Sequence, residues 1–205
     1  MLNCLNAFFV WMQRRLQGIP AGPAHIYDRV AARLLKTLHE KVAEEVCGVV
    51  DGGSRLLEFG CGTGRLMAMV LDRVVVGGAV CLDISSAMTR ISRRNLLERG
   101  FYGCVDIVLA DAQAMPFRDG CFDLIVSTGT LHHIRRPENL FRECARTLSG
   151  GGESWIYEFS HDVSKSELRS SARELGRNMY LIRVAAAMHG LPRSAYLAGY
   201  VKDAL

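Results

Sequence analysis

The stretch SRLLEFGCGTGR, residues 54–65, decides the fold class of this 205-residue chain. Its first part, Leu56–Phe59, is a short apolar run that carries one acid, Glu58, a pattern typical of a buried parallel strand. An apolar helical run, Leu66–Val70, follows three alternate glycines, Gly60, Gly62 and Gly64. Glycines let the backbone turn sharply and approach a ligand, and a helix start presents free N–H groups to the same point. The stretch therefore predicts a strand, a turn and a helix that cradle a polar or anionic small molecule.

The spacing of these glycines argues against the dinucleotide-binding fingerprint G-x-G-x-x-G. Gly64 comes one residue early, and Arg65 holds the place where that fingerprint needs its third glycine. A nicotinamide-dependent dehydrogenase is therefore the least favoured of the ligand-binding interpretations. The structural alternative is a tight turn between strand and helix that binds no ligand. The residues downstream of the turn must distinguish this alternative from a binding site.

Composition and charge bound the class of protein. Hydrophobic residues make up 49% and charged residues 22% of the chain, as in soluble globular domains, and the net charge of +4 is spread over scattered arginine pairs. The seven cysteines include no C-x-x-C pair, which favours reduced thiols over a disulfide framework or a zinc site. We therefore expect one cytoplasmic domain with no metal site and no nucleic-acid partner.

The first twenty residues, MLNCLNAFFVWMQRRLQGIP, contain an apolar run that is too short to span a bilayer. No positive region precedes this run, as it would in a signal peptide. A packed terminal helix is the favoured interpretation. An amphipathic helix on a membrane surface, or over the substrate entrance, is the alternative.

The rest of the chain alternates helical patterns with short buried strands. We expect strands at residues 79–83, 105–109, 122–127 and 154–159, and helices at 24–46, 85–98, 137–148, 164–188 and 191–205. Gly150–Gly152 should end the helix at 137–148 and form a turn before the last strand, and Gly176 should interrupt the helix at 164–188. This alternation predicts βαβ units and a parallel sheet. We divide the single domain into an N-terminal helical cap (1–50), a core (51–160) and a C-terminal helical segment (161–205).

Three acids stand at the same ends of three successive strands. Glu58 closes the first strand, Asp83 closes the second, and Asp111 follows the third. In an open parallel sheet these ends surround the ligand crevice. Asp83 is placed to accept hydrogen bonds from a ribose diol, and Asp111 can accept one from an adenine amino group. Each acid alone could be a helix cap or a solvated strand end, but three in register favour a binding site.

Four segments resemble the motifs of class I S-adenosylmethionine (SAM) dependent methyltransferases. They are EFGCGTG, CLDISSAM, LADAQAMPFRDGCFDLIVSTGTLHHI and PENLFRECARTLSGGG, and the similarity runs from Tyr27 to Phe159. It is strongest to the small-molecule methyltransferases that include the enzymes of ubiquinone and menaquinone biosynthesis. The resemblance implies a Rossmann-like, doubly wound, mostly parallel sheet with helices on both faces, and SAM as cofactor with S-adenosylhomocysteine (SAH) as product.

The same resemblance implies roles for individual residues. The glycines would line the methionine part of SAM, Asp83 would bind the ribose, and Ser127 and Thr128 would lie beneath the sulfonium. Tyr27 would close over the cofactor. The complete set of cofactor-binding residues that the resemblance implies is Tyr27, Glu58, Phe59, Gly60, Cys61, Gly62, Gly64, Asp83, Ile84, Met88, Asp111, Ala112, Ser127 and Thr128.

The adjacent residues His132 and His133 are the candidates for a general base, and a structural role at a helix entry is an equal alternative. No Ser-His-Asp arrangement, paired carboxylates or metal-ligand cluster supports a hydrolase. Methyl transfer from a sulfonium demands a base only when the acceptor must first lose a proton.

The sequence departs from the family after the fifth strand. Family members continue with a hairpin of strands six and seven, whereas residues 160–205 carry helical patterns, so we expect this hairpin to be absent and the chain to be shortened. The fifth strand would then be an open apolar edge, which the C-terminal helices, a second copy in a homodimer, or residues beyond this chain would have to cover. We expect a methyltransferase acting on a small-molecule acceptor. The alternative is a subunit that binds SAM or SAH without catalysis, or that a partner completes.

Overall fold

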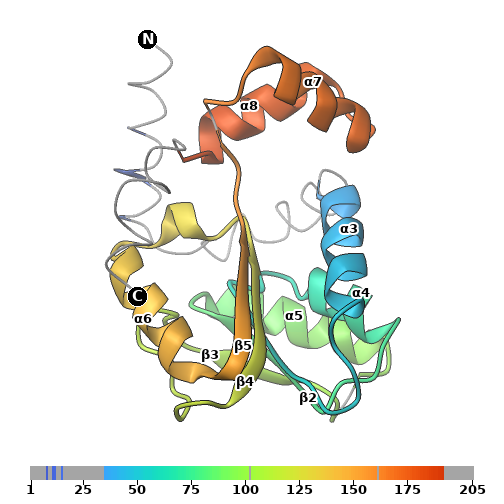
Figure 1. Cartoon of the computed structure of the whole chain (residues 1–205), viewed down its shortest axis with the longest axis vertical. Coiled ribbons are helices and arrows are strands. Elements are labelled where there is room, and N and C mark those ends of the chain that lie inside the picture. The colour runs from blue at the N-terminus through green and yellow to red at the C-terminus, as the bar shows by residue number, and fades with distance from the viewer. Residues whose placement is uncertain are drawn as a thin grey trace.

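The computed structural model of the chain describes residues 35–101, 103–160 and 162–191, together with Phe8, Trp11, Met12 and Arg15. Its centre is a five-stranded sheet in which all neighbouring strands are parallel, in the order β3-β2-β1-β4-β5 (Figure 1). The strands are β1 (Arg55–Phe59), β2 (Gly78–Asp83), β3 (Asp106–Leu109), β4 (Phe122–Thr128) and β5 (Leu148–Tyr157). This sheet confirms the expected α/β, Rossmann-like, doubly wound class.

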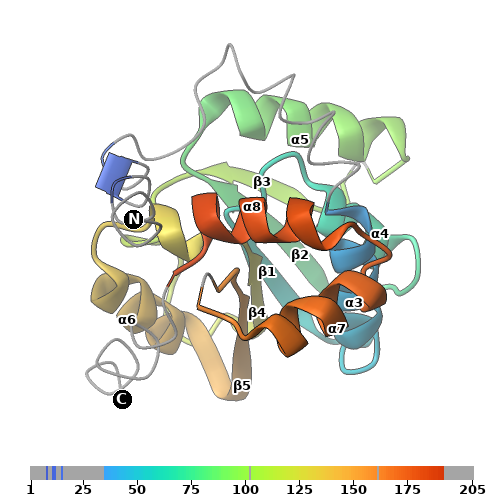
Figure 2. The ribbon, with the colours of Figure 1, turned by 90° about the horizontal axis from the view of Figure 1, so that it is seen from above.

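Helices cover both faces of the sheet, as the view from above shows (Figure 2). The helices from residue 35 onward are α3 (Lys36–Cys47), α4 (Arg65–Leu71), α5 (Ser86–Glu98), the 3-10 helix η1 (Leu131–His133), α6 (Pro137–Thr147), α7 (Lys165–Glu174) and α8 (Met179–His189). One apolar core joins the sheet to α3, α4 and the end of α5, and a second joins its other face to α6 and η1.

The strands divide their side chains between these two cores. Leu56 and Val126 are at most 1% exposed and belong to the core with α3 and α4. Leu57, Phe59 and Ile125 are fully buried in the core with α6. A strand that is buried on both faces shows an apolar run instead of strict alternation. This is why the runs within 55–59 and 122–127 identified β1 and β4 from the sequence.

The order of the strands creates a crevice beside β1. After β1 the chain adds β2 and β3 on one side, and it then returns to add β4 and β5 on the other side. Where the order reverses, the loops that leave the carboxyl ends of the two neighbouring strands diverge and leave room for a ligand. Here those loops are the glycine turn after β1 and residues 129–130 after β4.

Two expectations about the fifth strand are wrong. Helix α6 does end before Gly150–Gly152, but these glycines form no turn ahead of the strand, because they lie inside β5, which begins at Leu148 opposite Phe122. A register shift in β4 between Phe122 and Leu124 accommodates them, and a Cβ at Gly152 would stand 3.0 Å from the carbonyl oxygen of Asp123. The strand also ends at Tyr157, before the expected end at residue 159.

Past β5 the described residues form helices and one isolated β-bridge, between Ser160 and Leu191. The expected interruption at Gly176 is confirmed: this residue has φ 59° and separates α7 from α8. β5 is an edge of the sheet, and its pairing with a second copy stays a prediction, as does the division of the chain into three parts. The helix expected at 191–205 and most of the first half of the helix expected at 24–46 lie outside the described residues.

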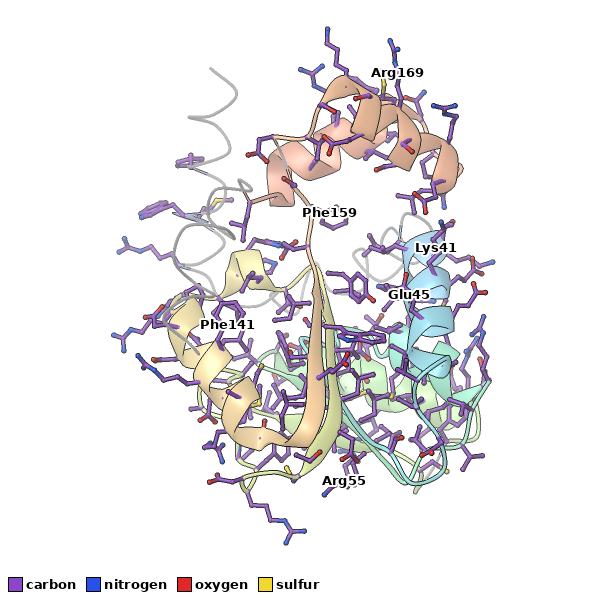
Figure 3. The ribbon with its side chains drawn as sticks, in the orientation of Figure 1. Lys41, Glu45, Arg55, Phe141, Phe159 and Arg169 are labelled. Carbon is purple, nitrogen blue, oxygen red and sulfur yellow. The ribbon has the colours of Figure 1, made fainter. Side chains whose placement is uncertain are left out.

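The hairpin of α7 and α8 lies above the carboxyl ends of the strands (Figure 1). Lys41 and Glu45, which Figure 3 shows on α3, tie this region together: Lys41 pairs with Glu174 of α7, and Glu45 accepts a hydrogen bond from the Tyr157 hydroxyl of β5. Of the helices in the described part of the chain, none is long and apolar enough to cross a membrane.

Candidate functional site

A pocket opens at the carboxyl ends of β1 to β4, at the crevice that the strand order creates. It is lined by Gly60, Gly62, Leu82, Asp83, Ile84, Met88, Asp111, Ala112, Gln113, Thr128, Gly129, Thr130, His133 and Ile134. Residues from the ends of four strands therefore meet in one place. Most of the residues that the sequence assigned to a cofactor are in this set.

The glycine turn forms the floor of the pocket beside β1. Gly60, Gly62 and Gly64 all have positive φ, between 53° and 72°, a conformation that side chains disfavour. A Cβ at Gly60 would stand 2.2 Å from the Thr130 hydroxyl, whereas a Cβ at Gly62 would meet no atom within 4 Å. Gly60 is therefore needed for packing between two loops. The open space at Gly62 is room that a ligand can fill.

Asp83 is held rigidly at the end of β2. One carboxylate oxygen accepts the N–H of Gly62 and the other accepts the N–H of Ser85, each at 2.8 Å. The residue is 8% exposed, and this burial raises the pKa of its carboxyl above the usual range. The backbone N–H of Ile84 also acts on this carboxylate, and a carboxylate has about four lone-pair sites, so these bonds do not use all of them. Asp83 is thus oriented by the backbone and still able to accept a hydroxyl group.

The far end of the pocket, at β3, contains a polar pair that the sequence reading found only in part. Asp111 Oδ1 accepts hydrogen bonds from the backbone and the side-chain amide of Gln113, both at 2.9 Å. The Gln113 carbonyl oxygen in turn accepts the backbone N–H of Arg136 at 2.8 Å. Met88, which is 1% exposed, and Ile84 add apolar surface at this end.

Several residues that the resemblance assigned to the cofactor do not line the pocket. Phe59 and Cys61 are buried in the two cores, Gly64 is the N-cap of α4, and Ser127 is fully buried. Glu58 is also buried and accepts the N–H of Met67 at 3.1 Å. It therefore supplies the side-chain cap that the N-cap residue of α4, a glycine, cannot provide. Burial raises the pKa of Glu58 to about 8. Tyr27 lies outside the described residues.

The two adjacent histidines occupy different places. His133 lines the pocket, but His132 is buried behind it, with its Nδ1 atom 3.0 Å from Glu158. The side chains of His132 and Glu158 are both 3% exposed, and the backbone N–H of His132 also donates to Glu158. His132 therefore fixes η1 against the end of β5, and His133 is the histidine that a bound molecule could meet.

Sequence reasoning missed the lining residues Leu82, Gln113, Gly129, Thr130 and Ile134. It also missed His39 of α3, whose Nε2 atom lies 3.3 Å from the hydroxyl of Thr128. The run S-T-G-T after β4 is a local signal for Thr130, because small polar residues and glycine at a strand end mark a crevice loop. No local signal pointed to His39. Across the described residues, no group of three or more His, Cys, Asp and Glu side chains could hold a metal ion.

Comparisons with known proteins agree with this geometry. Residues 57–156 match a family model described as "Methyltransferase domain". The ubiquinone/menaquinone biosynthesis C-methyltransferase UbiE of Xylella fastidiosa is 35% identical over 112 residues, which cover 54% of this chain and 44% of the relative. A malonyl-[acyl-carrier protein] O-methyltransferase of Geobacter sulfurreducens is 31% identical over 173 residues, or 83% of this chain and 55% of the relative.

Among solved structures, a protein assigned as an S-adenosyl-L-methionine-dependent methyltransferase from Methanococcus maripaludis superposes with a TM-score of 0.64. The identity is 23%, over 75% of this chain and 71% of that one. The sheet, its strand order and its glycine turn define a Rossmann-like α/β domain. Through residues 57–156, the chain belongs to the class I SAM-dependent methyltransferase family. It spans about half the length of the curated relatives it matches.

Proposed function

We propose that the chain binds SAM in the pocket at the carboxyl ends of β1 to β4 and transfers its methyl group to a small-molecule acceptor. One observation carries the proposal: Gly62, Asp83 and Asp111, from three different loops, meet in a single pocket that has open space at Gly62. That combination suits a nucleoside with a flexible polar tail. The family membership supports SAM as that nucleoside.

The strand order gives the cofactor a direction in the pocket. Asp111 and Ala112 would bind the adenine edge at the β3 end, with Ile84 and Met88 against its face. Asp83 would bind the ribose hydroxyls at β2, since the backbone N–H groups orient its carboxylate without using all of its lone-pair sites. The methionine part would then pass over Gly60 and Gly62 and bring the sulfonium to the β4 end, beside Thr128.

SAM supplies an electrophilic methyl group on a sulfonium, and its neutral thioether leaves without help from an acid. The chain's own task is therefore to position the two reactants and to exclude water. Apolar Met88 and Ile134 line the pocket next to its polar groups. His133, at the β4 end, is the candidate base for an acceptor that must lose a proton before or during transfer.

The relatives direct the choice of acceptor. Their names describe C-methylation in ubiquinone and menaquinone biosynthesis and O-methylation of a malonyl group on acyl-carrier protein. The two names thus specify a carbon acceptor in one relative and an oxygen acceptor in the other. We propose an acceptor of the same kind for this chain, a small molecule that offers a carbon or oxygen nucleophile. A subunit that binds SAH without turnover is the alternative that activity measurements distinguish.

Calorimetric titration with SAH tests the cofactor. We expect saturable micromolar binding to the wild-type chain and no binding of NADH. The Asp83→Ala variant should bind SAH at least about tenfold more weakly, because hydrogen bonds to a carboxylate are lost. Asp106→Ala removes an exposed acid from neighbouring β3 and is the matched control that should bind like the wild type.

Turnover is then measured as SAH release from SAM in the presence of quinol and carboxylate acceptors. Release that depends on an acceptor supports the enzyme. SAH binding with no release for any acceptor would favour the non-catalytic alternative, and NADH binding without SAH binding would overturn the cofactor assignment.

A further inference from the structure

A histidine of α3, His39, lies behind the pocket at its β4 end. Thr128 closes β4 and lines the pocket, and its hydroxyl lies 3.3 Å from Nε2 of His39. His39 belongs to α3, which packs on the sheet face away from α6. The imidazole therefore reaches the pocket only through the Thr128 hydroxyl. This contact joins residues 89 positions apart in the chain.

The surroundings of His39 keep its imidazole neutral. Burial, followed by the positive charge of Arg65, lowers the pKa of His39 to about 4. The imidazole also stands in the first turn of α3, where the positive end of the helix dipole further disfavours a second positive charge. The neighbouring charges on α3, Lys36 and Glu40, pair with each other at 3.5 Å. At neutral pH the His39 side chain therefore presents no positive charge to Thr128.

The neutral state of His39 matters because SAM, the proposed methyl donor, carries a positive charge on its sulfonium. If the proposed function holds, the sulfonium of SAM lies at the β4 end, and an imidazolium close by would repel it strongly in a partly buried site. Arg65, the other nearby cation, lines a separate hollow that it shares with Asn95, Glu98 and Arg99. His39 is thus the titratable group whose charge would act on the sulfonium through its contact with Thr128.

We propose that His39 is a positioning residue for methyl transfer: the Thr128 hydroxyl donates a hydrogen bond to Nε2 of its neutral imidazole, and the hydroxyl lone pairs are left facing the sulfonium. The pair then favours the cationic donor SAM over the neutral product SAH. A protonated imidazole would reverse this hydrogen bond and bring a positive charge to the same place. The inference rests on the proposed function, since it assumes that the pocket holds SAM.

The ratio of SAM affinity to SAH affinity tests this role, because a merely structural role would change both affinities together. His39→Lys places a permanent cation beside Thr128, and we expect it to shift the ratio about tenfold against SAM, which corresponds to about 1.4 kcal/mol. His39→Gln puts a neutral amide near the position of Nε2, and the ratio should stay within about twofold of the wild type. Both dissociation constants are measured by calorimetry on the full chain.

A second pair of variants keeps the test sharp if His39→Lys fails to fold. Thr128→Val removes the hydroxyl and keeps the side-chain shape, and we expect a several-fold shift of the ratio against SAM. Thr128→Ser keeps the hydroxyl and should preserve the ratio. If the wild type binds neither SAM nor SAH, the proposed function has failed. If it binds both, and neither the Lys nor the Val substitution moves the ratio, the role of His39 is refuted.

Discussion

At the scale of single residues, the three glycines after β1 do different work although they share one conformation. Gly60 gives room to Thr130 of the neighbouring loop, and a Cβ at Gly64 would stand 2.4 Å from the hydroxyl of Ser92 on α5. Only Gly62 faces open space. The motif thus combines two positions that pack against neighbouring residues with one position that is open to the proposed ligand, and substitutions can separate these functions.

Gly62→Ala and Gly64→Ala form the matched pair for this separation. Both introduce a Cβ at positive φ, which costs roughly 1–2 kcal/mol of stability. Gly64→Ala should lose about 2 kcal/mol more because its Cβ clashes with Ser92, and it should affect SAH binding only through folding. Gly62→Ala should remain folded but bind SAH at least about tenfold more weakly.

Urea unfolding and SAH calorimetry on both variants measure the two effects. Equal losses of stability in the two variants, or unchanged SAH affinity in Gly62→Ala, would contradict the assignment of Gly62 to the ligand.

At this scale, sequence reasoning finds a site residue when the signal lies in the residues next to it. It misses a contact between residues that are far apart in the chain. Gly62, Asp83 and Asp111 were found because each belongs to a strand end that has its own local pattern. Glu58 and Ser127 stood in the same patterns, but their side chains are buried and do not line the pocket. Alternate residues of a strand face opposite sides, and the motif alone does not say which side carries the ligand. Neither the sequence around His39 nor the sequence around Thr128 indicates the contact between these two residues.

At the scale of elements, η1 is fixed to the end of β5 by one carboxylate. Glu158 Oε2 accepts both the backbone N–H and Nδ1 of His132, at 3.1 Å and 3.0 Å, and Oε1 accepts the backbone N–H of Phe159 at 2.8 Å. The group is buried, so its hydrogen bonds have no competition from water. These bonds hold His133, the next residue of η1, against the pocket.

We expect Glu158→Ala to lower the free energy of unfolding by about 3 kcal/mol, since it leaves buried donors without an acceptor. It should also weaken SAH binding, because η1 and the loop after β4 lose their attachment. Glu153→Ala is the control on β5: its carboxylate is exposed and accepts a hydrogen bond from the Trp155 indole, so the loss should be below about 1 kcal/mol. Urea denaturation measures both, and similar losses would refute the role of Glu158.

The order and type of the elements in the core were predicted from the sequence because buried parallel strands are short apolar runs between turn residues. The start of β5 was not, because Gly150–Gly152 carry no side chain that could signal a strand. They fall in the register shift between the pairs Phe122–Leu148 and Leu124–Glu153, so their place in the strand depends on the neighbouring strand β4. Sequence patterns report side-chain environments, and an edge strand built from glycine has almost none.

At the scale of the whole molecule, a buried acid in the central strand couples global stability to pH. Glu58 is 2% exposed, and burial raises its pKa from the ordinary value of 4.5 to about 8. Between these two values the folded chain keeps a proton that the unfolded chain has released. At Glu58 the unfolded state then binds fewer protons than the native state, so the contribution of Glu58 to the free energy of unfolding falls as pH rises from about 4.5 to about 8. His39, whose pKa is lowered from 6.5 to about 4, contributes in the opposite sense between these values, and equally in the wild type and in variants of Glu58.

Glu58→Gln should remove this pH dependence, because a neutral amide resembles the protonated acid and its oxygen can still accept the N–H of Met67. Between pH 5.5 and pH 8 the wild type should lose about 3 kcal/mol relative to this variant, at about 1.4 kcal/mol for each pH unit. Asp123 and Glu143 have lowered pKa values and titrate below this window, so they do not contribute. Glu44→Gln, at an exposed position of α3, is the control that should follow the wild type. Urea denaturation at the two pH values measures the difference, and parallel pH profiles for the wild type and Glu58→Gln would show that Glu58 is ionised in the folded chain.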